Sequence, residues 1–269
     1  MSKRVCILGT APSWRQCPFD DPTLEIWALN DAWTMGIPRV DRWFELHPLD
    51  HLHFRPVGQR VVYAEDVPHG YYVRPQGHLE KLQEMARTIP VYLQSAPPQG
   101  WPVNAHQLDK AAIEAALAQK LGDAVPFQYW ASGPSYEIAL AILEGYTEIQ
   151  VWGIHLETEA EYREQRPNFE HLLGIARGLG IKVVMAPSSP LLKHGWQYAY
   201  QPKPTPHPAK ALLRRVQHDK SKVLGALAGL KRWQPRAHLV DQAHRLEARE
   251  RDCFRALQYR APVVIQAGV

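Results

Sequence analysis

The chain has 269 residues, 45% of them hydrophobic, and a net charge of +4, so it can bury a full core with room for one large domain and an appendage. No apolar run approaches the roughly 20 residues of a membrane span, and the N-terminus lacks the apolar core and cleavage site of a signal peptide. We therefore expect a soluble, cytoplasmic protein. The three cysteines are odd in number and far apart, which argues against a disulfide framework or a cysteine-based zinc site.

Two strands are predicted within the first 31 residues, and each ends in polar residues. RVCILG, residues 4–9, is a short apolar run closed by glycine, typical of the first strand of an α/β domain. The GTAPS loop that follows would lie at the carboxyl edge of a parallel sheet, where Thr10 and Ser13 could bind a nucleotide. LEIWALND places Asn30 and Asp31 at the carboxyl end of the second strand, with a plain turn as the alternative.

Residues 41–54 are rich in potential metal ligands. They comprise Glu45, His47, Asp50, His51 and His53 in the sequence DRWFELHPLDHLHF. The spacing matches no standard metal site, and the His-Pro pair after the strand-like RWFEL can equally form a polar loop at the sheet edge. We therefore assign no metal ligand.

The next stretch, residues 57–102, is rich in Pro, Gly, Tyr and His. We expect loops there, apart from a short strand at IPVYLQ, and such a long irregular stretch is usually a lid or an acceptor-binding region. A helix follows over residues 104–122, with Asn104 as its cap and Gly122 as its stop.

Residues 129–186 predict a βαβ unit, because the apolar period changes between helical and extended along this stretch. Gly133 can serve as N-cap of the first helix and Pro134 as its first residue. The N–H groups of Ser135 and Tyr136 would then be free and, with the positive end of the helix dipole, would bind an anion such as a phosphate. A capped helix with nothing bound is the alternative.

The second helix of this unit has two distinct faces. Its buried stripe is predicted to consist of Phe169, Leu172, Ala176 and Leu179. A neighbouring flank almost without side chains holds Pro167, His171, Gly174 and Gly178. This flank could admit a ligand, or it could pack tightly on the sheet.

A proline-rich linker separates a body, residues 1–202, from a tail, residues 203–269. Residues 203–260 carry 14 Lys or Arg against 5 Asp or Glu, a balance of +9 that leaves −5 for the rest. Helical spacing of apolar residues predicts two amphipathic helices broken near Pro235, a helical hairpin. The fold class is thus α/β, a Rossmann-like parallel sheet flanked by helices with a C-terminal hairpin. The basic tail could bind DNA or another anionic partner, form a homodimer, or be a pair of solvated helices.

Several short motifs together resemble a known family. They are GTAPS, LN after the second strand, ASG before a helix, EGYTEIQVWGIH, and GIKVVMAPSSPLL. The chain resembles the small bacterial CMP-sialic-acid-dependent sialyltransferases and the Maf-like glycosyltransferases. It is closer still to phage-encoded proteins that share an EYxxQRPNxExLLGxAxGxGI segment. The resemblance covers roughly residues 4–193 and leaves the tail out.

The resemblance implies roles for individual residues. The nucleotide-binding positions are Gly9, Thr10, Ser13 and Asn30, and the pair that holds the donor is Ser132 and Gly133. The family has GID where this chain has GIH, so His155 departs from the pattern and leaves the donor sugar open. We count His155 among the candidate catalytic residues, as a further candidate base. Tyr162 lies near a position where the family has a tyrosine that steadies the departing phosphate. His171 is nearest to the family's general base.

These observations favour a glycosyltransferase that transfers a sugar from a nucleotide donor to a hydroxyl, with no Asp-x-Asp motif to require a metal. The phage likeness suggests a hydroxymethylated base in DNA as acceptor, held by the basic tail. The alternative is a catalytically silent nucleotide-binding or scaffold protein whose hairpin binds a partner. A third possibility, pyrophosphate transfer to a pterin, rests on kinship with Maf-like proteins alone.

Overall fold

The computed structural model describes residues 3–56, 72–156, 162–193, 200, 208–229 and 237–258. Residues 3–56 and 72–193 belong to one compact unit, while the two C-terminal helices belong to a second. No helix within the described ranges is long and apolar enough to cross a membrane.

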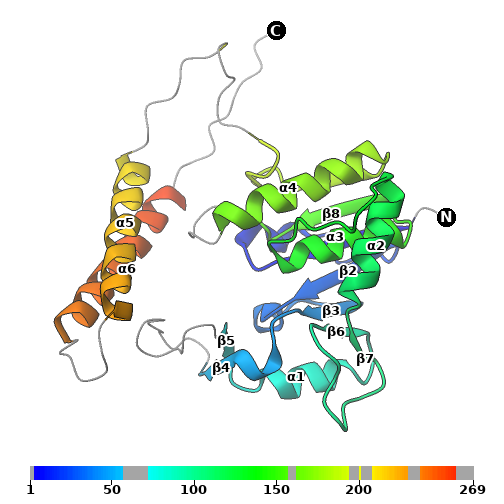
Figure 1. Ribbon diagram of the computed structural model, residues 1–269, viewed down its shortest axis with the longest axis horizontal. Helices are drawn as coiled ribbons and strands as arrows, with labels where there is room; N and C mark the ends of the chain where they lie inside the picture. Colours follow the sequence, from blue (N-terminus) through cyan, green and yellow to red (C-terminus); the bar gives the residue numbers. More distant parts are fainter. Residues whose placement is uncertain are drawn as a thin grey trace. The chain divides into compact units, whose positions relative to one another are not determined.

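The first unit is built on a seven-stranded sheet in which every neighbouring pair is parallel. The strand order is β7-β6-β3-β2-β1-β8-β9, so β1 lies inside the sheet between β2 and β8 (Figure 1). The bounds are β1 (Arg4–Leu8), β2 (Leu24–Leu29), β3 (Arg42–Glu45), β6 (Val91–Leu93), β7 (Ala105–Gln107), β8 (Glu148–Trp152) and β9 (Lys182–Met185). The predicted Rossmann-like α/β class is confirmed.

Helices cover both faces of this sheet. Alternate residues of β1 point to opposite faces, and because they are apolar on both, each face must be covered. Val5 and Ile7 pack with the apolar residues of α2 (Lys110–Leu121), α3 (Gly133–Leu143) and α4 (Tyr162–Gly178), which lie together on one face (Figure 1). Cys6 and Leu8 pack on the other face with α1 (His78–Met85) and with residues of the 3-10 turns η1 (Pro12–Gln16) and η2 (Ala32–Met35).

Two expectations for residues 57–122 are wrong. Residues 72–85 are not loops: β5 (Tyr72–Pro75) pairs with β4 (Leu52–Arg55) in a small parallel sheet, and α1 follows. Residues 57–71 lie outside the described ranges. The helix α2 begins at Lys110 and not near Asn104, because the carboxylate of Asp109 caps it by accepting from the N–H of Ala112 at 2.9 Å. The short strand β6 and the stop at Gly122 are confirmed.

The second unit contains α5 (Pro208–Gly229) and α6 (Ala237–Gln258), which pack against each other as the predicted hairpin. Their apolar contact consists of Val216, Val223, Ala243 and Leu246 with partly buried neighbours. At the polar rim, Lys220 Nζ lies 2.9 Å from a carboxylate oxygen of Glu250. Each helix therefore buries its apolar stripe on the other.

Candidate functional site

The strand order reverses at β1, since β2, β3, β6 and β7 follow on one side and β8 and β9 on the other. In open parallel sheets such a switch point opens a crevice beyond the carboxyl ends of the strands, and ligands bind there. The loops that leave β1 and β8 meet at this place.

Two glycines bring these loops into direct backbone contact. The N–H of Gly9 donates to the carbonyl oxygen of Trp152 at 2.9 Å, and the N–H of Ala11 donates to that of Gly153 at 2.7 Å. A Cβ on Gly9 would lie 2.4 Å from the carbonyl oxygen of Gly153. Gly153 itself has φ +71, and a Cβ there would lie 2.2 Å from the carbonyl oxygen of Gly9. Only glycine fits both positions.

The side chains of Ser13 and His155 add hydrogen bonds to the same contact between the two loops. The hydroxyl of Ser13 accepts from the N–H of Gly153 at 2.9 Å and lies 2.8 Å from Nε2 of His155. Ser13 is buried, so its hydroxyl links the two loops and does not project into the crevice. Thr10, in contrast, is exposed at the rim. The structure thus brings together a predicted nucleotide residue and a predicted catalytic residue from distant parts of the chain.

Asn30 and Asp31 end the neighbouring strand β2 in different ways. Asn30 has φ 55, and its N–H donates to the carbonyl oxygen of Phe44 at 2.9 Å. Asparagine tolerates this left-handed conformation better than most residues do. The carbonyl oxygen of Asp31 accepts from both the N–H and the hydroxyl of Thr34, at 3.0 and 2.9 Å. This bonding favours the turn interpretation for Asp31.

Helix α3 begins at the same edge, one residue earlier than expected, with Ser132 as N-cap. No side chain caps this end. The N–H of Ser135 donates to the carbonyl oxygen of Ser132 at 3.2 Å, so the prediction of a free donor there is wrong. Among the described residues, no acceptor is found for the N–H of Gly133 at this helix end.

A buried hydrogen-bond network fixes the residues around this helix start. Ser135 donates its hydroxyl proton to Oδ1 of Asn168 at 2.5 Å, and Ser132 Oγ lies 2.7 Å from Ser135 Oγ. Because the single proton of Ser135 is used, Ser132 must be the donor to Ser135. Asn168 also accepts from the N–H of Ala131 and donates to the carbonyl oxygen of Tyr129. Ser132 and Ser135 therefore tie α3 to α4 through their hydroxyls.

Asn168 is completely buried and was not among the residues predicted from the sequence. The signal was a polar residue between Pro167 and Phe169, at the edge of a stripe that is otherwise apolar. Within that stripe Phe169, Leu172 and Ala176 are fully buried as predicted, whereas Leu179 is 39% exposed. Apart from the backbone of α4 itself, no atom of the described residues lies within 4 Å of a Cβ built on Gly174 or Gly178, so tight packing within the described part does not explain these glycines.

His171 lies one turn after Asn168 and is exposed. Its ring centroid is 5.6 Å from that of Tyr129 and 6.0 Å from that of Phe127. These rings hold the imidazole by packing. Tyr162 is the first residue of α4, and its side chain lies outside the described part.

A second polar cluster surrounds Glu45 at the carboxyl end of β3. The completely buried carboxylate forms a bidentate pair with Arg74, at 2.7 and 3.0 Å, and accepts from Nε2 of His78 at 2.9 Å. Burial raises the pKa of Glu45, but hydrogen bonds from His47, His78 and Arg74 outweigh this effect and hold the pKa well below its ordinary value. Arg74 and His78 escaped the sequence analysis because they fall in the stretch assigned to loops.

The potential metal ligands of residues 41–54 do not gather into a metal site in the described part of the chain. Glu45 faces a guanidinium, while His51 ends the 3-10 turn η3 (Leu49–His51) and His53 lies on β4. In the described ranges, no group of three His, Cys, Asp or Glu residues could hold a metal ion.

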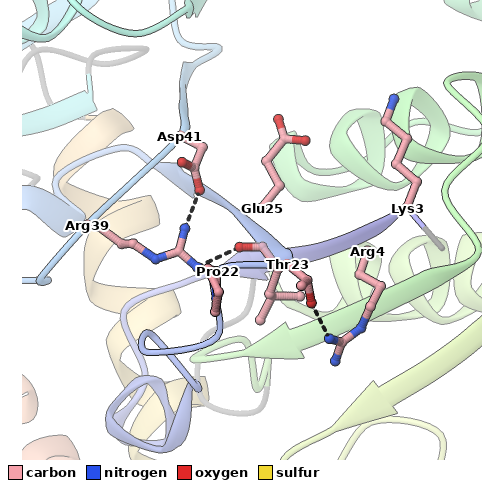
Figure 2. A pocket seen from close by; sticks show the side chains of 8 residues that line it. Lys3, Arg4, Pro22, Thr23, Glu25, Arg39 and Asp41 are labelled. Carbon is pink, nitrogen blue, oxygen red and sulfur yellow. Dashed lines mark hydrogen bonds and ion pairs between the residues drawn. The ribbon is translucent and has the colours of Figure 1, made fainter. Parts of the chain in front are cut away.

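A hollow of about 510 Å³ lies at the opposite, amino edge of the sheet, around Arg4, Thr23, Glu25, Arg39 and Asp41 (Figure 2). Its arginines are bound by protein groups. Arg39 Nη1 lies 2.8 Å from Asp41, and Arg4 Nη1 lies 2.6 Å from Asp21. This network joins neighbouring strands where they begin, and its cations are already neutralised.

No family model matches the chain, and no curated protein matches it. Two solved structures with a similar fold are those of the sialyltransferase CstII from Campylobacter jejuni, one in complex with a substrate analogue, cytidine-5'-monophosphate, and one with CMP-3FNeuAc. The identities are 14% and 13%, the alignments cover 70% of this chain and 81% and 82% of the CstII chains, and the TM-score is 0.40 for both. At this identity the likeness concerns the fold alone. The class defined by the fold is an α/β protein with a Rossmann-like parallel sheet.

Proposed function

We propose that this chain is a glycosyltransferase that transfers a sugar from a nucleotide donor to a hydroxyl acceptor at the carboxyl edge of its sheet. The observation that carries the proposal is the start of α3, which has no side-chain cap and lies beside the end of β3, where Leu46 Cδ1 is 4.0 Å from a Cβ built on Gly133. The positive end of the helix dipole and the N–H of Gly133 stabilise a departing phosphate there.

In this proposal, different residues at this edge bind the nucleotide, position the loops and carry out the chemistry. Thr10, at the exposed rim of the first loop, and Asn30, at the end of β2, bind the nucleotide. Gly9 holds the first loop against β8, and Ser13 positions His155. Tyr162, at the start of α4, steadies the leaving phosphate, as the family resemblance implies, and His171 is the base that the same resemblance assigns. No step requires a metal ion.

The acceptor in this proposal is a hydroxymethylated base in DNA, and the basic hairpin of α5 and α6 binds the duplex. Phosphate contacts supply most of the affinity of such binding.

A catalytically silent nucleotide-binding protein is the second candidate, and one observation favours it. The hydroxyls of Ser13, Ser132 and Ser135 all form hydrogen bonds within the chain. In this case the site would bind a nucleotide through Thr10, Asn30 and the helix end without turning over a donor.

A thermal-shift screen of CMP, nucleoside diphosphates and UDP-sugars tests the nucleotide site, because a ligand that binds only the folded state raises the melting temperature. We expect at least one nucleotide to stabilise the wild type, and the Thr10→Ala, Asn30→Ala double variant to lose that stabilisation. Thr88→Ala, which removes a threonine hydroxyl after α1, is the matched control and should respond as the wild type does. An equal response of the double variant would move the nucleotide elsewhere.

A further inference from the structure

Two of the three cysteines meet in the core on the α1 side of the sheet. Cys6 lies on β1 and Cys17 ends the 3-10 turn η1, and their Sγ atoms are 3.4 Å apart. Both thiols are free, and both residues are buried, with exposed fractions of 0% for Cys6 and 6% for Cys17. The fold therefore places two reduced sulfur atoms in direct contact.

The backbone is held differently on the two sides of this contact. Cys6 lies on an inner strand, where it pairs with Ile26 of β2 and with Gln150 of β8. Cys17 ends a short turn, and its N–H donates to the carbonyl oxygen of Trp14 at 3.1 Å. A disulfide holds its sulfur atoms about 2.05 Å apart, so these two must approach each other by about 1.4 Å. The end of a turn can make this movement more easily than a strand that is paired on both sides.

A bond between these sulfur atoms would close a short loop of the chain. Residues 6–17 contain the end of β1, the GTAPS loop and the whole of η1. In its middle this segment is anchored to β8, because Gly9 and Ala11 donate N–H bonds to the carbonyl oxygens of Trp152 and Gly153. The bond would anchor the far end of the segment to β1 as well.

Burial determines the order in which the two thiols react. It raises the pKa of the Cys6 thiol well above its ordinary value, and the hydrogen bond with Cys17 adds to this effect. Cys6 therefore remains a thiol near neutral pH and does not react first, because the nucleophile is the thiolate. Cys17 is the more exposed of the two residues and is the one that a small oxidant reaches first.

We propose that Cys6 and Cys17 are a site of reversible oxidation, at which hydrogen peroxide converts the two thiols into a disulfide. The sulfur of Cys17 attacks one peroxide oxygen and the O–O bond breaks, which gives a sulfenic acid and water. The sulfur of Cys6 then attacks the sulfur of Cys17, and the S–O bond breaks. The oxygen leaves as a second water with the thiol proton of Cys6. Two electrons pass from the sulfur atoms to the peroxide, and a dithiol reductant reverses the reaction.

Mass spectrometry of the full chain can locate the bond. Cys253→Ser removes the third cysteine, so Cys6 and Cys17 are the remaining pair within a chain. The folded protein is treated with hydrogen peroxide, its remaining thiols are blocked with iodoacetamide in denaturant, and it is digested with trypsin without reductant. Trypsin cleaves after Arg15, between the two cysteines. We expect their two peptides to be joined, with a mass lower by two hydrogen atoms, and to separate when dithiothreitol is added.

The melting temperature shows whether the native fold accommodates the bond. Closing the loop reduces the conformational entropy of the unfolded chain, so we expect the oxidised protein to melt about 5 °C higher than the reduced protein. Dithiothreitol should return the melting temperature to the reduced value. Cys17→Ala in the Cys253→Ser background is the matched control, because it lacks one sulfur of the pair and should show no reversible shift.

Three results would overturn the proposal. One is a folded protein that keeps both thiols in an excess of peroxide that fully oxidises free glutathione. Another is the addition of oxygen to either sulfur without a bond between them, and the third is a lower melting temperature after cross-linking. The inference is independent of the proposed function, because the two sulfur atoms are in contact whether or not the loop binds a nucleotide. A failed transferase assay would therefore leave the disulfide standing, and absence of the disulfide would leave the transferase standing.

Discussion

At the scale of single residues, the carboxyl group of Glu137 on α3 stands out. The side chain is completely buried, and neither oxygen has a hydrogen-bond partner in the described ranges. Burial raises the pKa of Glu137 well above its ordinary value. The folded protein therefore holds a proton at Glu137 that the unfolded chain releases above about pH 4.3.

This proton makes stability fall as pH rises. Between the unfolded and the folded pKa of Glu137, the free energy of unfolding should decrease by about 1.4 kcal/mol per pH unit. Glu137→Gln removes this titration. Its free energy of unfolding should therefore exceed that of the wild type at pH 7, and by much less at pH 4. Glu45 does not affect this comparison, because its depressed pKa lowers stability below about pH 4.3 equally in the wild type and in the variant. The free energies of unfolding of Glu137→Gln and the wild type are measured by urea unfolding at both pH values. The same difference between the two proteins at pH 4 and pH 7 would contradict the buried proton on Glu137.

The contact of Gly9 with Gly153 predicts a second effect at this scale. Gly9→Ala places a Cβ 2.4 Å from a backbone oxygen, so the loops must separate, at a cost of about 2 to 4 kcal/mol of unfolding free energy. Gly174→Ala is the matched control. Its added Cβ meets no described atom within 4 Å other than the backbone of α4, so replacing this helical glycine should stabilise the protein by up to about 1 kcal/mol. If Gly9→Ala melts at the wild-type temperature, the loops are not held by this contact.

At the scale of secondary-structure elements, local patterns predicted the parallel sheet well. Short apolar runs closed by glycine or polar residues marked β1, β2, β8 and β9, and glycine marked the end of α2. Such signals depend on neighbouring residues, so a sequence alone contains them.

The elements around Glu45 could not be found in this way. The helix α1 has only eight residues and follows Gly77, and the four residues of β5 include a proline and a charged Arg74. The reason for polar residues at positions 74 and 78 is their pairing with Glu45, which lies 29 and 33 residues earlier in the chain. A local sequence pattern does not contain this pairing. The sequence also predicted that Ser132 and Ser135 bind the donor. It could not predict that Ser135 donates its hydroxyl proton to Asn168, because this bond forms only when α3 and α4 pack together.

The hairpin of α5 and α6 carries a testable electrostatic role. Arg215 and Lys222 are exposed on α5. If both contact phosphates of duplex DNA, replacing them by Gln should lower the affinity and reduce the slope of log affinity against log salt by about 1.8, since each contact contributes about 0.9. Fluorescence anisotropy of labelled duplex with the full chain measures this slope. An unchanged slope would exclude these cations as DNA contacts.

At the scale of the whole molecule, the distribution of charge separates two roles. The balance is +9 over residues 203–260 and −5 over the rest. We propose that residues 1–202 carry the chemistry and that the tail carries partner binding. If the tail instead forms a homodimer, removing it should convert a dimer into a monomer in solution, as measured by light scattering, and leave DNA binding unaffected.

The central claim is turnover of a nucleotide-sugar donor at the carboxyl edge of the sheet. The measurement that tests it most directly is the release of nucleotide from CMP- and UDP-sugars by the full chain, with the Thr10→Ala, Asn30→Ala double variant beside it. We expect release by the wild type, without added metal, and a large loss in the double variant. Absence of release from every donor whose nucleotide raises the melting temperature would contradict it, and would leave a nucleotide-binding protein without this activity.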